Sequence, residues 1–296
     1  MGEKIGLVGV GLMGSAMSEQ LIGAGYEVKG YDIDTKRLND LEERGGKAAS
    51  SPGEAVSGAR LVILSLMTSD IIRGVLFGKD GVAETGQGDL LVIDTSTSRP
   101  EDSIQNAKDL QTHGISFVDA SLSGSSPMIR QKKTVAMVGG ERADFERVKP
   151  VLETIARAVY HLGPHGAGAR TKLIVNLILG LNRLAMAEGL VLGMKSGMDM
   201  EMLLAVLKDS FAYSRAMDNR GERMIKADYD DPMSRLRQHH KDVGLMLEQG
   251  NKLGSPMLLT SVLKQILVMA EENGQGDWDT CSSIEVLRRM AGIPSR

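Results

Sequence analysis

Three closely spaced glycines near the N-terminus place the strongest constraint on the fold. In the segment "KIGLVGVGLMGSAM", Gly9, Gly11 and Gly14 follow an apolar run typical of a buried strand and open a run typical of a helix. Glycines at this spacing allow a tight turn after a strand and close packing of the next helix on the sheet. The segment therefore predicts the first strand-helix unit of a doubly wound, largely parallel sheet.

The remainder of the chain divides into two parts with different patterns. Up to residue 163, short β-rich runs such as "EVKGYD", "ARLVILSL", "DLLVIDTS" and "TVAMVGG" alternate with helical patterns. Beyond that point only helical periods follow, at 167–195, 200–209, 213–227, 233–252, 256–273 and 282–291, the last opening with a Ser282-to-Glu285 pattern typical of a capping box. We therefore expect an α/β Rossmann domain over residues 1–163 and an all-α domain over 164–296, which begins with a long inter-domain helix.

The glycine turn is a candidate nucleotide site because the second strand ends in an acidic residue, Asp32. A carboxylate there can accept hydrogen bonds from the adenosine ribose hydroxyls and repels a 2′-phosphate, so NAD is favoured. Lys36 and Arg37 follow closely and leave NADP possible. Ligands of such sheets lie beyond the carboxyl ends of the strands, which adds the segments "LMTSD" and "TSTSRP". The candidate cofactor residues are Gly9, Gly11, Leu12, Met13, Gly14, Asp32, Met67, Thr68 and Thr97, with Ser96 beside them. The alternative is a glycine-rich turn that binds no nucleotide.

Bulk composition excludes several other classes of protein. The 35 basic and 38 acidic residues give a net charge of −3, which does not favour a nucleic-acid partner. A single cysteine, Cys281, precludes an internal disulfide, and the five histidines lack metal-ligand spacing, so we expect a metal-independent protein. The apolar stretch 173–193 is interrupted by polar residues such as Arg183 and Glu188. We therefore expect a soluble, cytoplasmic protein without a membrane partner.

A lysine near the start of the long helix is the candidate proton-transfer group. In "HGAGARTKLIVN", Lys172 precedes Asn176 by four positions, so both side chains project from one helix face. The start of a helix carries partial positive charge, which should lower the pKa of an ammonium group placed there. The alternative is an ordinary solvated lysine.

Four patterns in the same order resemble the β-hydroxyacid dehydrogenase family, which includes 3-hydroxyisobutyrate dehydrogenase and semialdehyde reductases. They are "GLVGVGLMGSAM", "DASLSGS", "GAGARTKLIVN" and "KDVGLMLEQG", and the similarity runs the full length of the chain. The resemblance implies hydride transfer between a nicotinamide cofactor and a small hydroxyacid or semialdehyde, in a homodimer or homotetramer. It also implies Lys172 as the acid/base. The implied substrate contacts are Ser123, Gly124, Asn176 and Lys241, with Lys241 also bordering the nicotinamide.

The chain departs from the family pattern at several positions. Ser121 replaces a proline, Ser125 replaces a glycine, and Val175 stands where asparagine or histidine is usual. The segment "PMIRQKKTV" replaces a run of small and apolar residues beside the substrate loop. Either Arg130 or Lys132 meets an extra anionic or polar group of an unusual substrate, or these charges face solvent on an edge strand.

Two other functions remain as alternatives. An oxidative decarboxylase of the phosphogluconate type would act on a similar 3-hydroxyacid, but such enzymes usually have a longer helical domain and a histidine where this chain has Val175. A non-catalytic nucleotide-binding scaffold would keep the fold without the chemistry. Retention of Lys172, Ser123 and Asn176 argues against a scaffold.

Overall fold

The fold combines an α/β unit with an all-helical unit, as the sequence predicts. The computed structural model describes residues 2–86 and 88–294. The chain divides within helix α9 into Met1–Lys172 and Leu173–Arg296, and each unit has cores of its own. The domain boundary expected after residue 163 stays a prediction.

The first unit is built on an eight-stranded sheet with the order β3-β2-β1-β4-β5-β6-β7-β8. Neighbouring strands are parallel except β6 and β7, which are antiparallel. The strands are β1 (Lys4–Val8), β2 (Glu27–Tyr31), β3 (Lys47–Ala48), β4 (Leu61–Leu64), β5 (Leu91–Asp94), β6 (Ser116–Ser123), β7 (Val135–Gly139) and β8 (Ala158–His161). The chain order reverses between β1 and β4, which is where open parallel sheets bind ligands.

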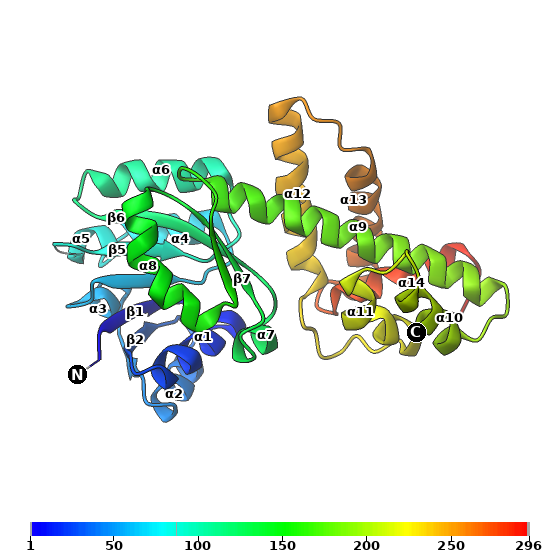
Figure 1. Cartoon of the computed structure of the whole chain (residues 1–296), viewed down its shortest axis with the longest axis horizontal. Helices are drawn as coiled ribbons and strands as arrows, with labels where there is room; N and C mark the ends of the chain where they lie inside the picture. The colour runs from blue at the N-terminus through cyan, green and yellow to red at the C-terminus, as the bar shows by residue number, and fades with distance from the viewer. Residues whose placement is uncertain (1, 87, 295–296) are drawn as a thin grey trace. The chain divides into compact units, whose positions relative to one another are not determined.

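Helices cover both faces of this sheet (Figure 1). One face packs against α1 (Leu12–Gly23), α2 (Thr35–Glu43), α7 (Ser126–Arg130) and α8 (Arg142–Ile155). The other face packs against α3 (Pro52–Val56), α4 (Ser69–Phe77), α5 (Val82–Thr85) and α6 (Pro100–Gln111). Strands β4 and β5 are buried along their whole length, because both of their faces are covered.

The second unit contains only helices in its described residues. They are α9 (Ala167–Lys195, whose first residues belong to the first unit), α10 (Met200–Asp209), α11 (Arg215–Lys226), α12 (Leu236–Leu253), α13 (Leu258–Ala270) and α14 (Ile284–Met290), with a π-helical turn at Glu271–Gln275 and a 3₁₀ turn at Thr280–Ser283. Within the described residues, α9 is the helix with the length and hydropathy to cross a membrane. The same properties are common in core helices of soluble proteins.

The capping box expected at Ser282 is wrong. The 3₁₀ turn Thr280–Ser283 precedes α14, and Asp279 caps that turn by accepting the amide of Cys281. Glu285 is fully buried and accepts the Tyr229 hydroxyl at 2.7 Å, so its carboxylate is engaged by tertiary contacts. Long-range packing has replaced the local motif that the sequence suggested.

Two buried carboxylates at neighbouring positions in the sheet should make stability depend on pH. Asp94 and Asp119 are paired in register on β5 and β6, and each side chain is 1% exposed. Burial raises the pKa of Asp94 to about 6, while hydrogen bonds from Ser96 act against it. Burial likewise raises the pKa of Asp119 to about 7.

Asp94→Asn should therefore flatten the pH profile of stability. Because the pKa of Asp94 is higher in the folded chain, the free energy of unfolding falls as the pH rises from about 4 to 6. Asparagine removes this loss. Between pH 4 and pH 8, the free energy of unfolding of the variant should therefore rise by about 3 kcal/mol relative to that of the wild type. Urea denaturation at a series of pH values measures the free energy of unfolding of the wild type and of the variant. If the two free energies changed with pH in parallel, the expectation would be contradicted.

Candidate functional site

The turn after β1 accepts only glycine at two positions. Gly9 has a φ of 93°, and a Cβ there would lie 2.3 Å from the carbonyl oxygen of Ser65. A Cβ on Gly14 would lie 1.9 Å from the carbonyl oxygen of Gly9. The backbone of α1 therefore approaches the end of β1 as closely as the predicted glycine turn requires.

The start of α1 is suited to bind a pyrophosphate. Its N-cap is Gly11, which offers no capping side chain, and its first turn has no acidic residue. Leu12 is 67% exposed and Met13 is half-buried, so the first turn lies at the surface. Amide groups at such a helix start attract anions through hydrogen bonding and the helix dipole. The chain thus offers the cradle that a dinucleotide cofactor needs.

Asp32 lies just beyond β2 and is joined to the glycine turn. Its Oδ2 accepts the amide of Val10 at 2.7 Å, and its Oδ1 accepts the amide of Asp34 at 3.0 Å. The guanidinium of Arg37 lies 3.3 Å from Oδ2. Arg37 also lies over the turn, since a Cβ on Gly11 would come within 3.6 Å of it. A carboxylate, which repels a 2′-phosphate, and a guanidinium, which attracts one, therefore lie side by side.

The remaining cofactor candidates lie where β4 and β5 end. Met67 is 60% exposed, and the Thr68 hydroxyl caps α4 by accepting the amide of Ile71 at 3.3 Å. Thr97 is half-buried in the turn after β5. Ser96 joins the two turns, because its hydroxyl accepts the amide of Leu66 at 2.9 Å. These turns are neighbours at the same edge of the sheet as the glycine turn.

Lys172 lies at the carboxyl end of β6. Its Nζ donates a hydrogen bond to the carbonyl oxygen of Leu122 at 2.6 Å. Ser123 is the next residue and ends the strand, and Gly124 follows it with a φ of 143°. The first unit thus brings together the predicted proton-transfer group and two predicted substrate contacts.

The departure at Ser121 has a structural explanation. The side chain is buried, and its hydroxyl donates to the carbonyl oxygen of Ser96 at 3.0 Å. This bond joins β6 to the turn after β5. A proline could not make it, so this chain holds the turn by a different means.

Sequence reasoning missed Asp119, which lies three residues before Leu122 on β6. Its carboxylate accepts backbone amides from the start of α9, the helix that carries Lys172. The available signal was a charged residue between Val118 and Ala120 of a predicted strand, since a charge buried in a sheet needs partners.

Asn176 and Lys241 are held by the same carboxylate in the helical unit. The side-chain amide of Asn176 donates to Asp242 Oδ2 at 3.2 Å, and Lys241 Nζ lies 3.2 Å from Asp242 Oδ1. Asp242 itself is 7% exposed. Asp242 therefore has a structural role, because it fixes the side chains of two predicted substrate contacts.

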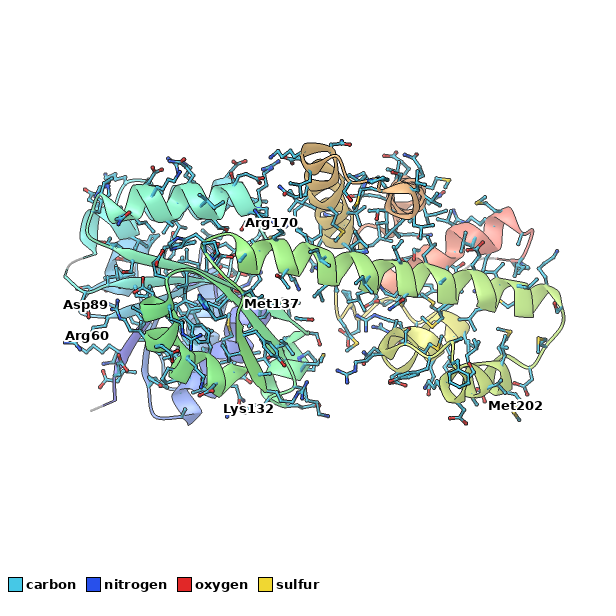
Figure 2. All side chains as sticks on the ribbon, turned by 45° about the horizontal axis from the view of Figure 1, so that its top comes forward. Arg60, Asp89, Lys132, Met137, Arg170 and Met202 are labelled. Atoms are coloured by element: carbon cyan, nitrogen blue, oxygen red, sulfur yellow. The ribbon has the colours of Figure 1, made fainter. Side chains whose placement is uncertain are left out.

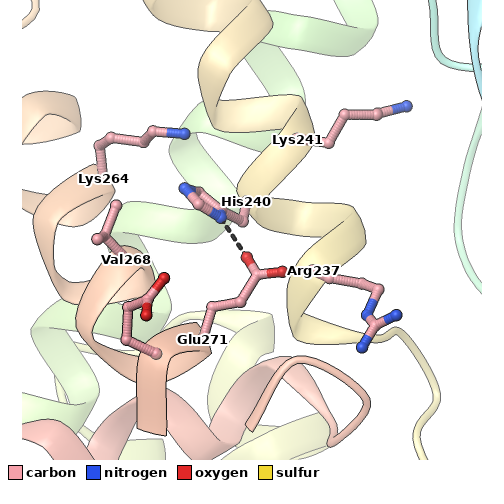
Figure 3. Close-up of a pocket in the computed structure, with 7 residues that line it drawn as sticks. Arg237, His240, Lys241, Lys264, Val268 and Glu271 are labelled. Atoms are coloured by element: carbon pink, nitrogen blue, oxygen red, sulfur yellow. Dashed lines mark hydrogen bonds and ion pairs between the residues drawn. The ribbon is translucent and has the colours of Figure 1, made fainter. Parts of the chain in front are cut away.

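Lys241 also lines a cavity of about 460 Å³ between α12 and α13 (Figure 3). His240 contacts Glu271 there, while the Lys241 side chain points away from both (Figure 3). The other lining residues are Arg237, Lys264, Val268 and Glu272. Acidic and basic groups are mixed in this lining, so it favours no single class of ligand.

The segment after the substrate loop is a short helix, α7, and not the edge strand that one interpretation required. Arg130 forms two hydrogen bonds to Glu19 of α1, at 2.6 and 3.0 Å. This pairing holds the pKa of the Glu19 carboxyl below its usual value. Lys132 lies in the turn before β7 with its side chain exposed (Figure 2). Arg130 therefore has an intramolecular anion as its partner.

A largely parallel sheet with a G-x-G-x-x-G turn at its switch point defines a dinucleotide-binding protein. Residues 4–163 match the model of the NAD-binding domain of 6-phosphogluconate dehydrogenase, and residues 166–287 match that of the NAD-binding domain of NADP-dependent 3-hydroxyisobutyrate dehydrogenase. The chain belongs to the β-hydroxyacid dehydrogenase family and is an NAD(P)-dependent oxidoreductase of the 3-hydroxyisobutyrate dehydrogenase type.

Individual relatives match over nearly the full length of the chain. The chain is 31% identical to 2-(hydroxymethyl)glutarate dehydrogenase of Eubacterium barkeri, over 98% of this chain and 96% of the relative. It is 28% identical to 3-sulfolactaldehyde reductase of Escherichia coli, over 99% of this chain and 98% of the relative. The crystal structure of 3-hydroxyisobutyrate dehydrogenase from Salmonella typhimurium superimposes with a TM-score of 0.88 at 28% identity, over 96% of this chain and 99% of that one. Helix α9 is therefore part of a known dehydrogenase fold.

Proposed function

We propose that the protein interconverts a small 3-hydroxyacid and its semialdehyde with NAD, and that Lys172 is the acid/base. The observation that carries this proposal is the hydrogen bond from Lys172 Nζ to the carbonyl oxygen of Leu122, 2.6 Å long. It places the amine at the strand end that continues into Ser123 and Gly124, at the sheet edge that bears the glycine turn.

The chemistry divides between the cofactor and the chain. A bound nicotinamide supplies or accepts the hydride. In the oxidative direction, Lys172 in its neutral form takes the proton of the substrate hydroxyl; in the reductive direction its ammonium returns that proton. The hydroxyl of Ser123 and the amide of Gly124 donate hydrogen bonds to the substrate carboxylate without adding a competing charge. Asn176 and Lys241 are proposed as further substrate contacts, with Lys241 also near the cofactor.

A substrate panel tests this function. Reduction of NAD should be measured with 3-hydroxyisobutyrate and with hydroxyacids that carry a second carboxylate, a sulfonate or a phosphonate. We expect turnover on at least one of them, without release of carbon dioxide. Carbon dioxide release in step with NADH formation would favour the decarboxylase instead. Cofactor binding without turnover on any member would favour the scaffold.

Cofactor preference should depend on Asp32 and Arg37 in opposite directions. The carboxylate of Asp32 repels a 2′-phosphate, whereas the Arg37 guanidinium attracts it. Asp32→Asn keeps an acceptor for the amide of Val10 and removes the charge, so kcat/KM for NADP relative to NAD should rise by roughly 10-fold or more. Arg37→Ala should lower the same ratio. A wild-type preference for NADP would overturn the assignment of NAD.

We also propose that the protein is cytoplasmic and forms a homodimer or homotetramer. Exposed apolar side chains of the helical unit, such as Val206 and Phe211, support self-association. Light scattering after size-exclusion chromatography measures the mass, and a monomer at micromolar concentration would contradict the proposal.

A further inference from the structure

Asp119, on β6, binds the start of α9. Its Oδ1 accepts the amide of Gly166 at 2.7 Å, and its Oδ2 accepts the amide of Ala169 at 2.8 Å. The side chain is 1% exposed, so water does not compete for these bonds. A carboxylate in this place satisfies two helix-end amides and opposes the partial positive charge of the helix start. A neighbouring strand, and not a residue just ahead of the helix, therefore caps α9.

Glycines permit this close approach of the helix to the strands. Gly166 has a φ of 86°. A Cβ on Gly168 would lie 2.4 Å from the carbonyl oxygen of Met137, and a Cβ on Gly139 would lie 2.8 Å from the amide nitrogen of Ala167. The first turn of α9 is thus pressed directly against β6 and β7. The two glycines of the "GAG" segment before Lys172 therefore allow the close contact between helix and strands in which Asp119 binds the helix amides.

The same strand and the same helix meet again at Lys172. This residue lies three positions after Ala169 on α9, and its partner Leu122 lies three positions after Asp119 on β6. The hydrogen bond to Leu122 uses one N–H of the amine, which leaves its other positions to exchange a proton with a substrate. The bonds of Asp119 are independent of that exchange and can hold the helix in place during it.

We propose that Asp119 is a positioning residue, which fixes the start of α9 so that the Lys172 amine stays beside the end of β6. The inference rests on the proposed acid/base role of Lys172. Asp94 provides a matched control, because it is equally buried at the paired position of β5. Its carboxylate accepts the amide of Ser96 and contacts no part of α9 through a hydrogen bond among the described residues.

The test compares Asp119→Asn and Asp119→Ala, each alone and combined with Lys172→Ala, by kcat, KM and the Kd of NADH. Asparagine retains one acceptor oxygen and alanine none. We expect kcat to fall by roughly 10-fold and 10²-fold respectively, because small displacements of a catalytic group have losses of this size. The Kd of NADH should not change, and Asp94→Asn should keep kcat near the wild-type value. In the Lys172→Ala background, neither substitution should lower the residual rate further.

Equal fold losses in both backgrounds would overturn the inference, because Asp119 would then support the fold without acting through Lys172. Wild-type kcat in Asp119→Ala would overturn it too. Gly168→Ala gives a second route, because a Cβ there would lie 2.4 Å from the carbonyl oxygen of Met137 and 2.8 Å from Asp119 Oδ2, and so would displace the helix start from β6 and β7. It should lower kcat only when Lys172 is present. If Lys172→Ala alone has no effect, it is the proposed function that fails.

Discussion

Lys172→Ala is expected to lower kcat by about 10²- to 10⁴-fold, the usual contribution of a general acid or base. The Kd of NADH should stay near the wild-type value, because the glycine turn and Asp32, which are proposed to hold the cofactor, belong to other elements than Lys172. Steady-state rates and fluorescence titration of NADH separate the two quantities. A variant that kept more than a tenth of the wild-type kcat would remove the acid/base role.

Two comparisons make this result specific to the amine. Lys195→Ala removes an exposed lysine from the far end of the same helix and should leave kcat unchanged. Added methylamine or ethylamine should restore part of the lost rate to Lys172→Ala, since a small amine can enter the space of the missing side chain. Rescue should rise with the concentration of the free base. Equal rescue of the wild type would point to a general buffer effect.

The parts of the site that the sequence predicted are those encoded locally. Gly9, Gly11 and Gly14 act within one turn, and Lys172 and Asn176 are one helical turn apart, so spacing along the chain was sufficient. Helix α9 was predicted over its observed bounds because its apolar pattern is long and uninterrupted by proline or a turn. The α/β and all-α character of the two units was predictable for the same reason.

The parts that it did not predict depend on partners far apart in the chain. Asp119 binds amides 47 and 50 residues away, and no local pattern reveals them. Glu285 resembled a capping residue, yet Tyr229 engages it from 56 residues away. Arg130 was a candidate contact for an anionic substrate, but it pairs with Glu19, 111 residues away. In each case, a charged group found a partner that only the folded chain brings near.

Asp279→Asn is expected to destabilise the helical unit by about 3–5 kcal/mol. Asp279 is fully buried; its Oδ1 lies 2.8 Å from Arg220 Nε, and its Oδ2 lies 3.2 Å from Arg223. Oδ2 also accepts the amide of Met233 at 2.8 Å. Asparagine keeps the shape but removes the counter-charge of the buried Arg220 guanidinium, and it leaves Arg223 paired with Asp228 alone. Urea denaturation followed by circular dichroism measures the loss.

Asp277→Asn is the matched control, because Asp277 forms a 2.8 Å ion pair with Arg237 in which the side chains are 64% and 52% exposed. An exposed pair is expected to contribute at most about 1 kcal/mol, so burial is the variable under test. Burial acts to raise the pKa of Asp279, but the arginines and backbone donors together hold it below its usual value. Its stabilisation is therefore present above about pH 4 and is lost as the pH falls below that. The difference between wild type and Asp279→Asn should shrink in the same range, whereas equal effects of the two substitutions at neutral pH would contradict the role of burial.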